Sequence, residues 1–404
     1  MSNPHRSYLP PEILDYIIDL LDDGLETLGE CCLVSKSWVP RTRKHLFAEV
    51  WFQSAAKLWL WKKTFPDHAS SPAYHTHTLF VGCPGDVTVA DAEQGGWIRS
   101  FSRVVELVVY SSRGKPHPPE VSLIPFHGFS PVLKCLDVYS STLSTSETFA
   151  LISSLPLLED LTLSTCVDED DPNFSVPLTV FKPTSPALAV DLSPSKTLER
   201  TARKLLGSPN GLHFRTIVLS FSHGVDIQWI TALVVGCSRT LESLTIMSSM
   251  DGAFVYFPLS GCSPFPFKDT SGQPSIDLTE ATKLGDVLFD SFSSWNVEWM
   301  TLTLQTITPN HRNLRQISIY LDYDYDWVQD VREAIGEAVC EWLALDRVLV
   351  QLWESYSIRS KIKYSRVWRR EKREEKEVGE FVGCLLPETT KKGIIDLVEW
   401  DGYE

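Results

Sequence analysis

One apolar pattern recurs along most of this chain and limits the folds it can adopt. In most copies a first apolar residue is followed by two more, three and five positions later, as in Leu133, Leu136 and Val138. Two weaker copies, centred on Leu79 and Val190, keep only the last two of these residues. Successive copies are separated by 25 to 31 residues, apart from one step of 43. The central residues are Leu79, Leu107, Leu136, Leu161, Val190, Ile217, Leu244, Val287, Ile317 and Val348. A constant period of this size indicates a repeat architecture.

Each copy predicts a short strand, because its last two apolar residues alternate and therefore point to one face. The remaining residues of each copy must provide a helix that covers this face. Helical apolar spacing occurs in residues 146–155, 226–235, 295–306 and 328–343. The sequence therefore predicts an α/β protein.

The pattern resembles the leucine-rich repeat, in an irregular form that lacks the Asn or Cys ladder after the strand. That family forms an α/β solenoid, a horseshoe in which short parallel strands line the concave side. A doubly wound α/β domain, which also alternates strand and helix, is the alternative. Residues 257–275, rich in Pro, Ser and Gly, predict a loop insertion, and residues 360–404 predict C-terminal capping helices.

The first 52 residues predict a separate module of three helices. Pro10 and Pro11 suit the first turn of a helix, and the apolar residues that follow recur at helical spacing. Thr27 and Glu30 have the spacing of a capping box for a second helix. Pro40 opens a third, for which Val50 is an apolar position.

Two short motifs in this module resemble the F-box. The first is the run Leu9-Pro10-Pro11-Glu12-Ile13-Leu14, and the second runs from Leu33 and Val34 to Trp38. The family docks on a Skp-type adaptor of cullin ubiquitin ligases, and the chain departs from it in the Cys31–Cys32 pair and Gly29. The resemblance implies adaptor contacts for Leu9, Pro10, Pro11, Ile13, Leu14, Leu33, Val34 and Trp38. From the residues alone, the same side chains could instead fill the core of the module.

Composition and motifs exclude several functions. A formal net charge of −15 disfavours nucleic acid as the main partner. Nine cysteines without a C-x-x-C pair, no apolar signal segment and no membrane-spanning run predict an intracellular protein, cytoplasmic or nuclear. No nucleotide-binding, hydrolase or metalloprotease motif occurs, so we expect no enzyme activity and no cofactor.

These patterns predict two domains, a helical module over residues 1–52 and a solenoid over residues 53–404. In a horseshoe, residues that alternate with the buried ones face the concave surface. Those expected to contact a protein substrate are Glu106, Tyr110, Asp137, Tyr139, Asp160, Asp191, Asp286 and Tyr320. Aromatic anchors among acidic residues predict a basic segment in the substrate, although the acids could equally reflect the acidity of the whole chain.

The predicted function is that of a non-catalytic substrate receptor in a Skp–cullin–F-box ubiquitin ligase. A scaffold that binds an adaptor or another partner without ubiquitin transfer is the alternative.

Overall fold

The computed structural model describes residues 10–21, 24–67, 70–82, 84, 87, 91, 96–110, 123–139, 145–164, 187–192, 195–207, 211–221, 227–248, 276–291, 297–321, 325–365 and 374–400. These residues form two compact units, which divide between Leu158 and Glu159. Both units combine helices with parallel strands, so the predicted α/β class is confirmed.

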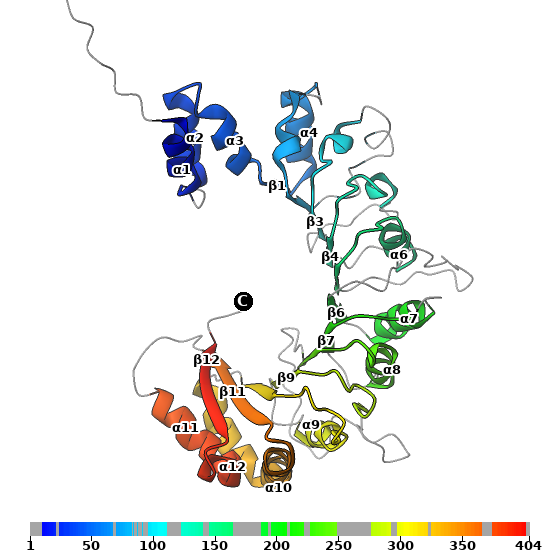
Figure 1. Ribbon diagram of the computed structural model, residues 1–404, viewed down its shortest axis with the longest axis vertical. Helices are drawn as coiled ribbons and strands as arrows, with labels where there is room; N and C mark the ends of the chain where they lie inside the picture. The colour runs from blue at the N-terminus through cyan, green and yellow to red at the C-terminus, as the bar shows by residue number, and fades with distance from the viewer. Residues whose placement is uncertain are drawn as a thin grey trace, which may run out of the picture. The chain divides into compact units, whose positions relative to one another are not determined.

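Unit 1, the described residues up to Leu158, begins with three helices and continues with four parallel strands (Figure 1). Within it, β1 pairs with β2, β2 with β3, and β3 with β4. Its elements are α1 (Pro11–Asp19), α2 (Leu25–Val34), α3 (Val39–Leu46), β1 (Glu49–Phe52), α4 (Ala55–Thr64), η2 (Pro72–His75), β2 (Thr78–Val81), η4 (Trp97–Ser100), β3 (Glu106–Tyr110), η5 (Ile124–Phe126), β4 (Cys135–Tyr139) and α6 (Thr145–Ser153).

Aromatic packing holds the start of unit 1 together. Phe52 on β1 lies edge-on to Trp61 of α4, Trp97 of η4 and Phe101, at ring-centroid distances of 5.6, 5.5 and 6.0 Å. Because side chains alternate along a strand, burial of Phe52 turns the preceding Trp51 to the opposite face.

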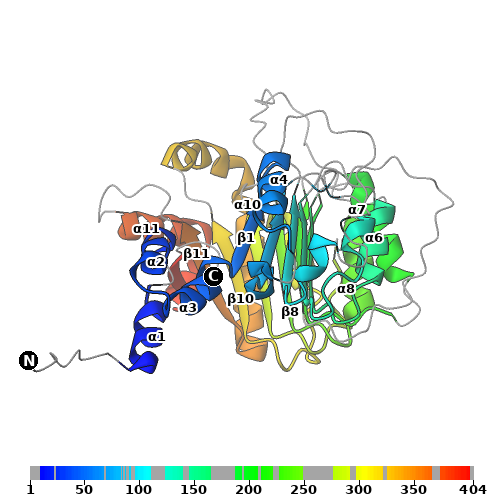
Figure 2. The same cartoon turned by 90° about the horizontal axis from the view of Figure 1, so that it is seen from above.

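Unit 2, the described residues from Glu159 onward, contains eight parallel strands in sequence order. Its helices α7 and α8 lie on the same side of the strands in both views (Figures 1 and 2). Its elements are β5 (Asp160–Ser164), β6 (Ala187–Leu192), α7 (Ser195–Leu206), β7 (Thr216–Phe221), α8 (Ile227–Cys237), β8 (Ser243–Ser248), β9 (Asp286–Ser291), α9 (Val297–Leu304), β10 (Gln316–Leu321), α10 (Tyr325–Tyr356), β11 (Arg359–Ser365), α11 (Glu374–Leu385), α12 (Pro387–Lys391) and β12 (Ile395–Trp400).

The central apolar residues of the predicted copies align across neighbouring strands. In unit 1, Leu79 lies opposite Leu107, which lies opposite Leu136, and all three are fully buried. In β6 the aligned residue is Leu188, which lies opposite Ile217, rather than the predicted Val190. This shift of two residues leaves the predicted faces unchanged, since only a shift by an odd number of residues exchanges them.

A repeated backbone turn precedes several of the described strands. The amides of Val104, Leu133, Leu284 and Leu314 each donate to the carbonyl three residues earlier, and these apolar side chains are buried. Just before the strands, backbone bonds continue from copy to copy, as from Lys134 to Val105 and from Gly285 to Glu242. The turns are therefore built from main-chain groups, which many side chains can accommodate.

Two predicted elements near the C-terminal end are wrong, and one prediction is not tested. The copy centred on Val348 lies inside α10, where Leu345, Leu349 and Leu352 bury one helical stripe. Residues 360–404 contain β11 and β12 as well as helices. The predicted insertion at residues 257–275 lies outside the described residues.

Two local predictions in the helical module are also wrong. The helix α2 begins at Leu25 after Gly24, with no side-chain cap, so Thr27 and Glu30 form no capping box at its start. Val50 belongs to β1 rather than to the third helix.

Substitution of Asp346 tests how the end of unit 2 is held. Its carboxylate is 1% exposed and accepts hydrogen bonds from the backbone amides of Glu388 and Thr389, both at 2.9 Å, at the start of α12. Asp346→Ala leaves these amides without an acceptor, so we expect the free energy of unfolding to fall by about 1 to 3 kcal/mol. Urea denaturation followed by circular dichroism measures this change.

Asp396→Ala is the matched control, because its carboxylate is exposed and lies 3.7 Å from Arg359. A surface ion pair of this kind contributes less than about 1 kcal/mol. Equal effects of the two substitutions would contradict the role assigned to Asp346.

Candidate functional site

The helices α1 and α2 carry exposed apolar side chains at the amino terminus of unit 1. The interior of this module is small and includes Ile18, Leu28, Cys31 and Thr42. Large apolar residues that remain exposed on α1 and α2, called here the apolar helix surface, are Ile13 (46%), Tyr16, Ile17, Leu20, Leu25, Leu33 (87%) and Val34 (66%). A cluster of exposed large apolar side chains marks a site of interaction.

The residues expected to contact an adaptor are distributed between surface and interior. Pro10, Ile13, Leu33 and Val34 are exposed, whereas Leu14 and Trp38 are half-buried. Leu9 and the side chain of Pro11 lie outside what the structure describes. Exposure of Leu33 and Val34 argues against the alternative that they fill the core of the module.

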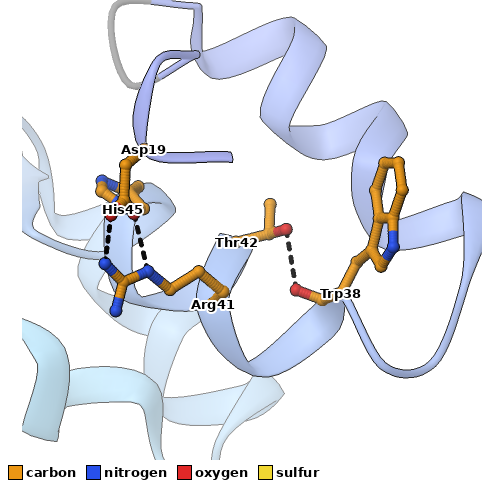
Figure 3. Close-up of polar contacts among 5 residues, drawn as sticks. All are labelled: Asp19, Trp38, Arg41, Thr42 and His45. Atoms are coloured by element: carbon orange, nitrogen blue, oxygen red, sulfur yellow. Dashed lines mark hydrogen bonds and ion pairs between the residues drawn. The ribbon is translucent and has the colours of Figure 1, made fainter. Parts of the chain in front are cut away.

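A charged cluster ties the end of α1 to α3. Arg41 Nε donates to Asp19 Oδ1 at 2.6 Å, a second guanidinium nitrogen pairs with Oδ2, and His45 Nε2 lies 2.7 Å from Oδ1 (Figure 3). The hydrogen bond from Arg41, helped by that of His45, lowers the pKa of Asp19 from 3.8 to about 2, although burial opposes the shift. Sequence reasoning missed this cluster, because its members lie 22 and 26 residues apart.

Trp38 is held at the start of α3 by its backbone. Its carbonyl accepts hydrogen bonds from the amide and the hydroxyl of Thr42, at 3.0 and 2.9 Å, and its amide donates to Ser35. The indole ring points away from the Asp19 cluster (Figure 3). The turn thus fixes the position of the half-buried ring relative to α3.

The second candidate surface is the strand face of unit 1 that alternates with the buried residues. Of the predicted residues, Glu106, Tyr110 and Asp137 are half-buried there and Tyr139 is 43% exposed. Sequence reasoning missed Trp51 and Phe80, which stack with ring centroids 3.5 Å apart, because β1 was assigned to a helix. The run Val50-Trp51-Phe52, which is rich in β-branched and aromatic residues, was the signal that could have identified this strand.

The corresponding face of unit 2 is more basic than predicted. Asp160 is half-buried, Asp286 is exposed and hydrogen-bonded to Ser243, and the side chain of Asp191 lies outside the described residues. Tyr320 is buried, at 6% exposure, so its expected position on an open surface is wrong. Arg359, Lys361 and Lys363 of β11 lie on this face, in register with Gln316, Ser318 and Tyr320 of β10.

A hollow of about 830 Å³ lies over β8 to β11 of unit 2. The charged side chains in its lining are Glu242, Lys283, Asp286, Arg315 and Lys363. Arg215, which is outside this lining, lies 3.7 Å from Glu242, so the charge of that carboxylate is partly neutralised. The hollow therefore has mixed charge, and the predicted acidic character does not extend to it.

Two kinds of chemical group are relevant among the described residues, metal ligands and thiols. None of them forms a group of three or more His, Cys, Asp or Glu side chains placed to hold a metal ion. Burial raises the pKa of the Cys237 thiol to about 12, which keeps it protonated and unreactive at neutral pH. Across the helices that the structure describes, none is long and apolar enough to span a membrane.

Comparisons of the chain with models of known protein families and with curated proteins found no match in either set.

The pKa of Asp19 predicts a pH dependence of stability. Because the pKa is lower in the folded state, the stabilisation is fully present above pH 3.8 and is lost as the pH falls towards about 2. The difference in unfolding free energy between the wild type and Asp19→Asn should be at most about 1 kcal/mol at pH 6, since the pair is partly solvated. This difference in unfolding free energy should be smaller at about pH 3.

Urea denaturation at both pH values measures this difference. A difference that stays constant between the two pH values would show that the charge of Asp19 contributes nothing to stability.

Proposed function

We propose that this chain is the substrate-recognition subunit of a Skp–cullin–F-box ubiquitin ligase. Residues 1–52 would dock on the Skp-type adaptor, and the strand faces of residues 53–404 would bind a protein substrate. The adaptor would connect the chain to a cullin, and the complex would act in the cytoplasm or nucleus. The chain itself would be non-catalytic and would need no cofactor, membrane or nucleic acid.

The observation that carries this proposal is the exposure of motif residues on the apolar helix surface. Leu33 is 87% exposed and Val34 66% exposed at the end of α2, in a module whose interior is small. Burial of a Leu or Val side chain against a partner contributes about 1.5 to 3 kcal/mol. Such residues leave a module marginally stable on its own and favour association with an apolar partner.

The order of the strands supports the solenoid as the architecture of the remainder. Within each unit every strand pairs with the strands that precede and follow it in the sequence. A doubly wound sheet would instead reverse its strand order at a switch point. Neither unit contains such a reversal among its described strands, which favours the leucine-rich-repeat-like arrangement.

Substitution of Leu33 and Val34 tests adaptor binding separately from folding. Leu33→Asp combined with Val34→Asp removes no core contact, because both side chains are exposed, and should lower the unfolding free energy by no more than about 2 kcal/mol through helix propensity and the dipole of α2. Two buried apolar contacts would be lost at the interface, so the affinity for a purified Skp-type adaptor should fall at least about thirtyfold. Isothermal titration calorimetry measures this affinity.

Val235→Asp is the matched control, since Val235 is 45% exposed on α8 of unit 2. It should bind the adaptor as the wild type does. Undiminished binding by the double variant would exclude the proposed docking surface.

A second step distinguishes a ligase receptor from a scaffold without ubiquitin transfer. The complex of the chain with its adaptor is mixed with a purified cullin and analysed by size-exclusion chromatography. Joint elution of all three proteins supports the receptor, whereas a cullin that elutes alone supports the scaffold.

A further inference from the structure

Aromatic side chains form a continuous patch on the open strand face of unit 1. Trp51 of β1 lies opposite Phe80 of β2, and Tyr110 of β3 lies opposite Tyr139 of β4. Trp51 and Phe80 stack with an angle of 10° between their rings. Trp51 nevertheless remains 44% exposed, so part of its ring surface is open to a ligand.

The ring of Tyr110 packs directly on the backbone of Gly82. A Cβ atom at Gly82 would come within 2.6 Å of this ring, so any larger residue there would displace the ring from its present position. Tyr110 is therefore held against the sheet beside the Trp51–Phe80 pair. The patch is a pre-formed aromatic surface rather than a set of scattered side chains.

Carboxylates border this patch. Residues that lie opposite one another on neighbouring strands form rows across the sheet. Glu49 and Glu106 both lie opposite Thr78, in the row before the Trp51–Phe80 pair. Asp137 lies in the same row as that pair, two strands beyond Phe80. Thr78 Oγ1 donates to Glu106 Oε2 at 3.1 Å, which orients that carboxylate. Neighbouring rows and strands are about 5 to 7 Å apart, so one extended peptide can reach both kinds of group.

No Lys or Arg side chain lies within strands β1 to β4 of the described chain. The open face of unit 2 differs, because β11 adds Arg359, Lys361 and Lys363 to it. A cationic ligand is therefore favoured on unit 1 in particular, and the general acidity of the chain does not explain this difference.

We propose that the open face of β1 to β4, called here the aromatic–acidic face, binds an arginine-bearing segment of a partner protein. The guanidinium group of one arginine would stack on the Trp51–Phe80 pair and pair with Glu106 on the neighbouring strand β3. A second arginine would pair with Asp137, which lies one strand further along the same row, beyond Val108. Arginine suits this face better than lysine, because its planar group stacks on aromatic rings and pairs with a carboxylate through two hydrogen bonds. That the partner is a ligase substrate rests on the proposed function, whereas the binding itself does not.

Fluorescence anisotropy with labelled peptides tests this inference. The probe is a nine-residue Gly/Ser peptide with three arginines, compared with versions that carry lysine or the neutral isostere citrulline in their place. The full chain should bind the arginine peptide at about 0.15 M salt, at least about threefold more tightly than the lysine peptide. The citrulline peptide should show no measurable binding.

Variants with matched controls locate the site. Trp51→Ala should weaken arginine-peptide binding about tenfold. Trp59→Ala, at a tryptophan on α4 that is more exposed than Trp51 (61% against 44%), should change it less than about twofold. Asp137→Asn should weaken binding about threefold to tenfold. Asp396→Asn removes the same charge from the exposed surface of unit 2 and should have little effect.

Other results of these binding measurements would contradict the inference. Equal losses for Asp137→Asn and Asp396→Asn indicate attraction to the net charge only, and equal affinities for lysine and arginine exclude the stacked guanidinium. Phe80→Ala, at the other ring of the stacked pair, serves if Trp51→Ala fails to fold, and its full retention of binding would overturn the aromatic contribution.

Adaptor affinity is measured on the same variants and should not change. Loss of peptide binding with intact adaptor binding thus separates a failure of this inference from a failure of the proposed function.

Discussion

In-register parallel pairing of short strands is the constraint on which the rest of the structure depends. Each strand spans only four to seven residues, so its backbone groups depend on both neighbours. Pairing in register places the apolar residues of successive copies, such as Leu79, Leu107 and Leu136, on one covered face. The same register arranges the alternating residues on the open face, and therefore creates the rows of aromatic and acidic side chains in unit 1.

The helical module follows a different principle, in which stability and docking compete for the same side chains. Its interior includes only a few well-buried residues, while Leu33 and Val34 remain in solvent. The Asp19–Arg41 pair compensates in part by fixing α1 against α3 through charge rather than apolar burial. This arrangement keeps the three helices in place and leaves their apolar surface available to a partner.

The sequence predicted the elements whose signals are local. Strands such as β3, β4, β8 and β10 followed from the apolar repeat, since one copy contains the whole pattern. The strand prediction failed around Val348, because the apolar residues there fit both the two-residue period of a strand and the 3.6-residue period of a helix, and they form part of α10. It missed the Asp19 cluster and the stacking of Trp51 on Phe80, which bring together residues 22 to 29 positions apart. Burial of Tyr320 was equally unpredictable, since its neighbours in sequence do not indicate what covers it.

The central claim is that the chain docks through the apolar helix surface of α1 and α2. Hydrogen–deuterium exchange of the full chain, with and without a purified Skp-type adaptor, tests it most directly. The account predicts slower exchange in peptides that cover residues 11–34 when the adaptor is present, and unchanged exchange in the strands of unit 2. Unchanged exchange over residues 11–34, or slower exchange confined to the strands, would contradict it.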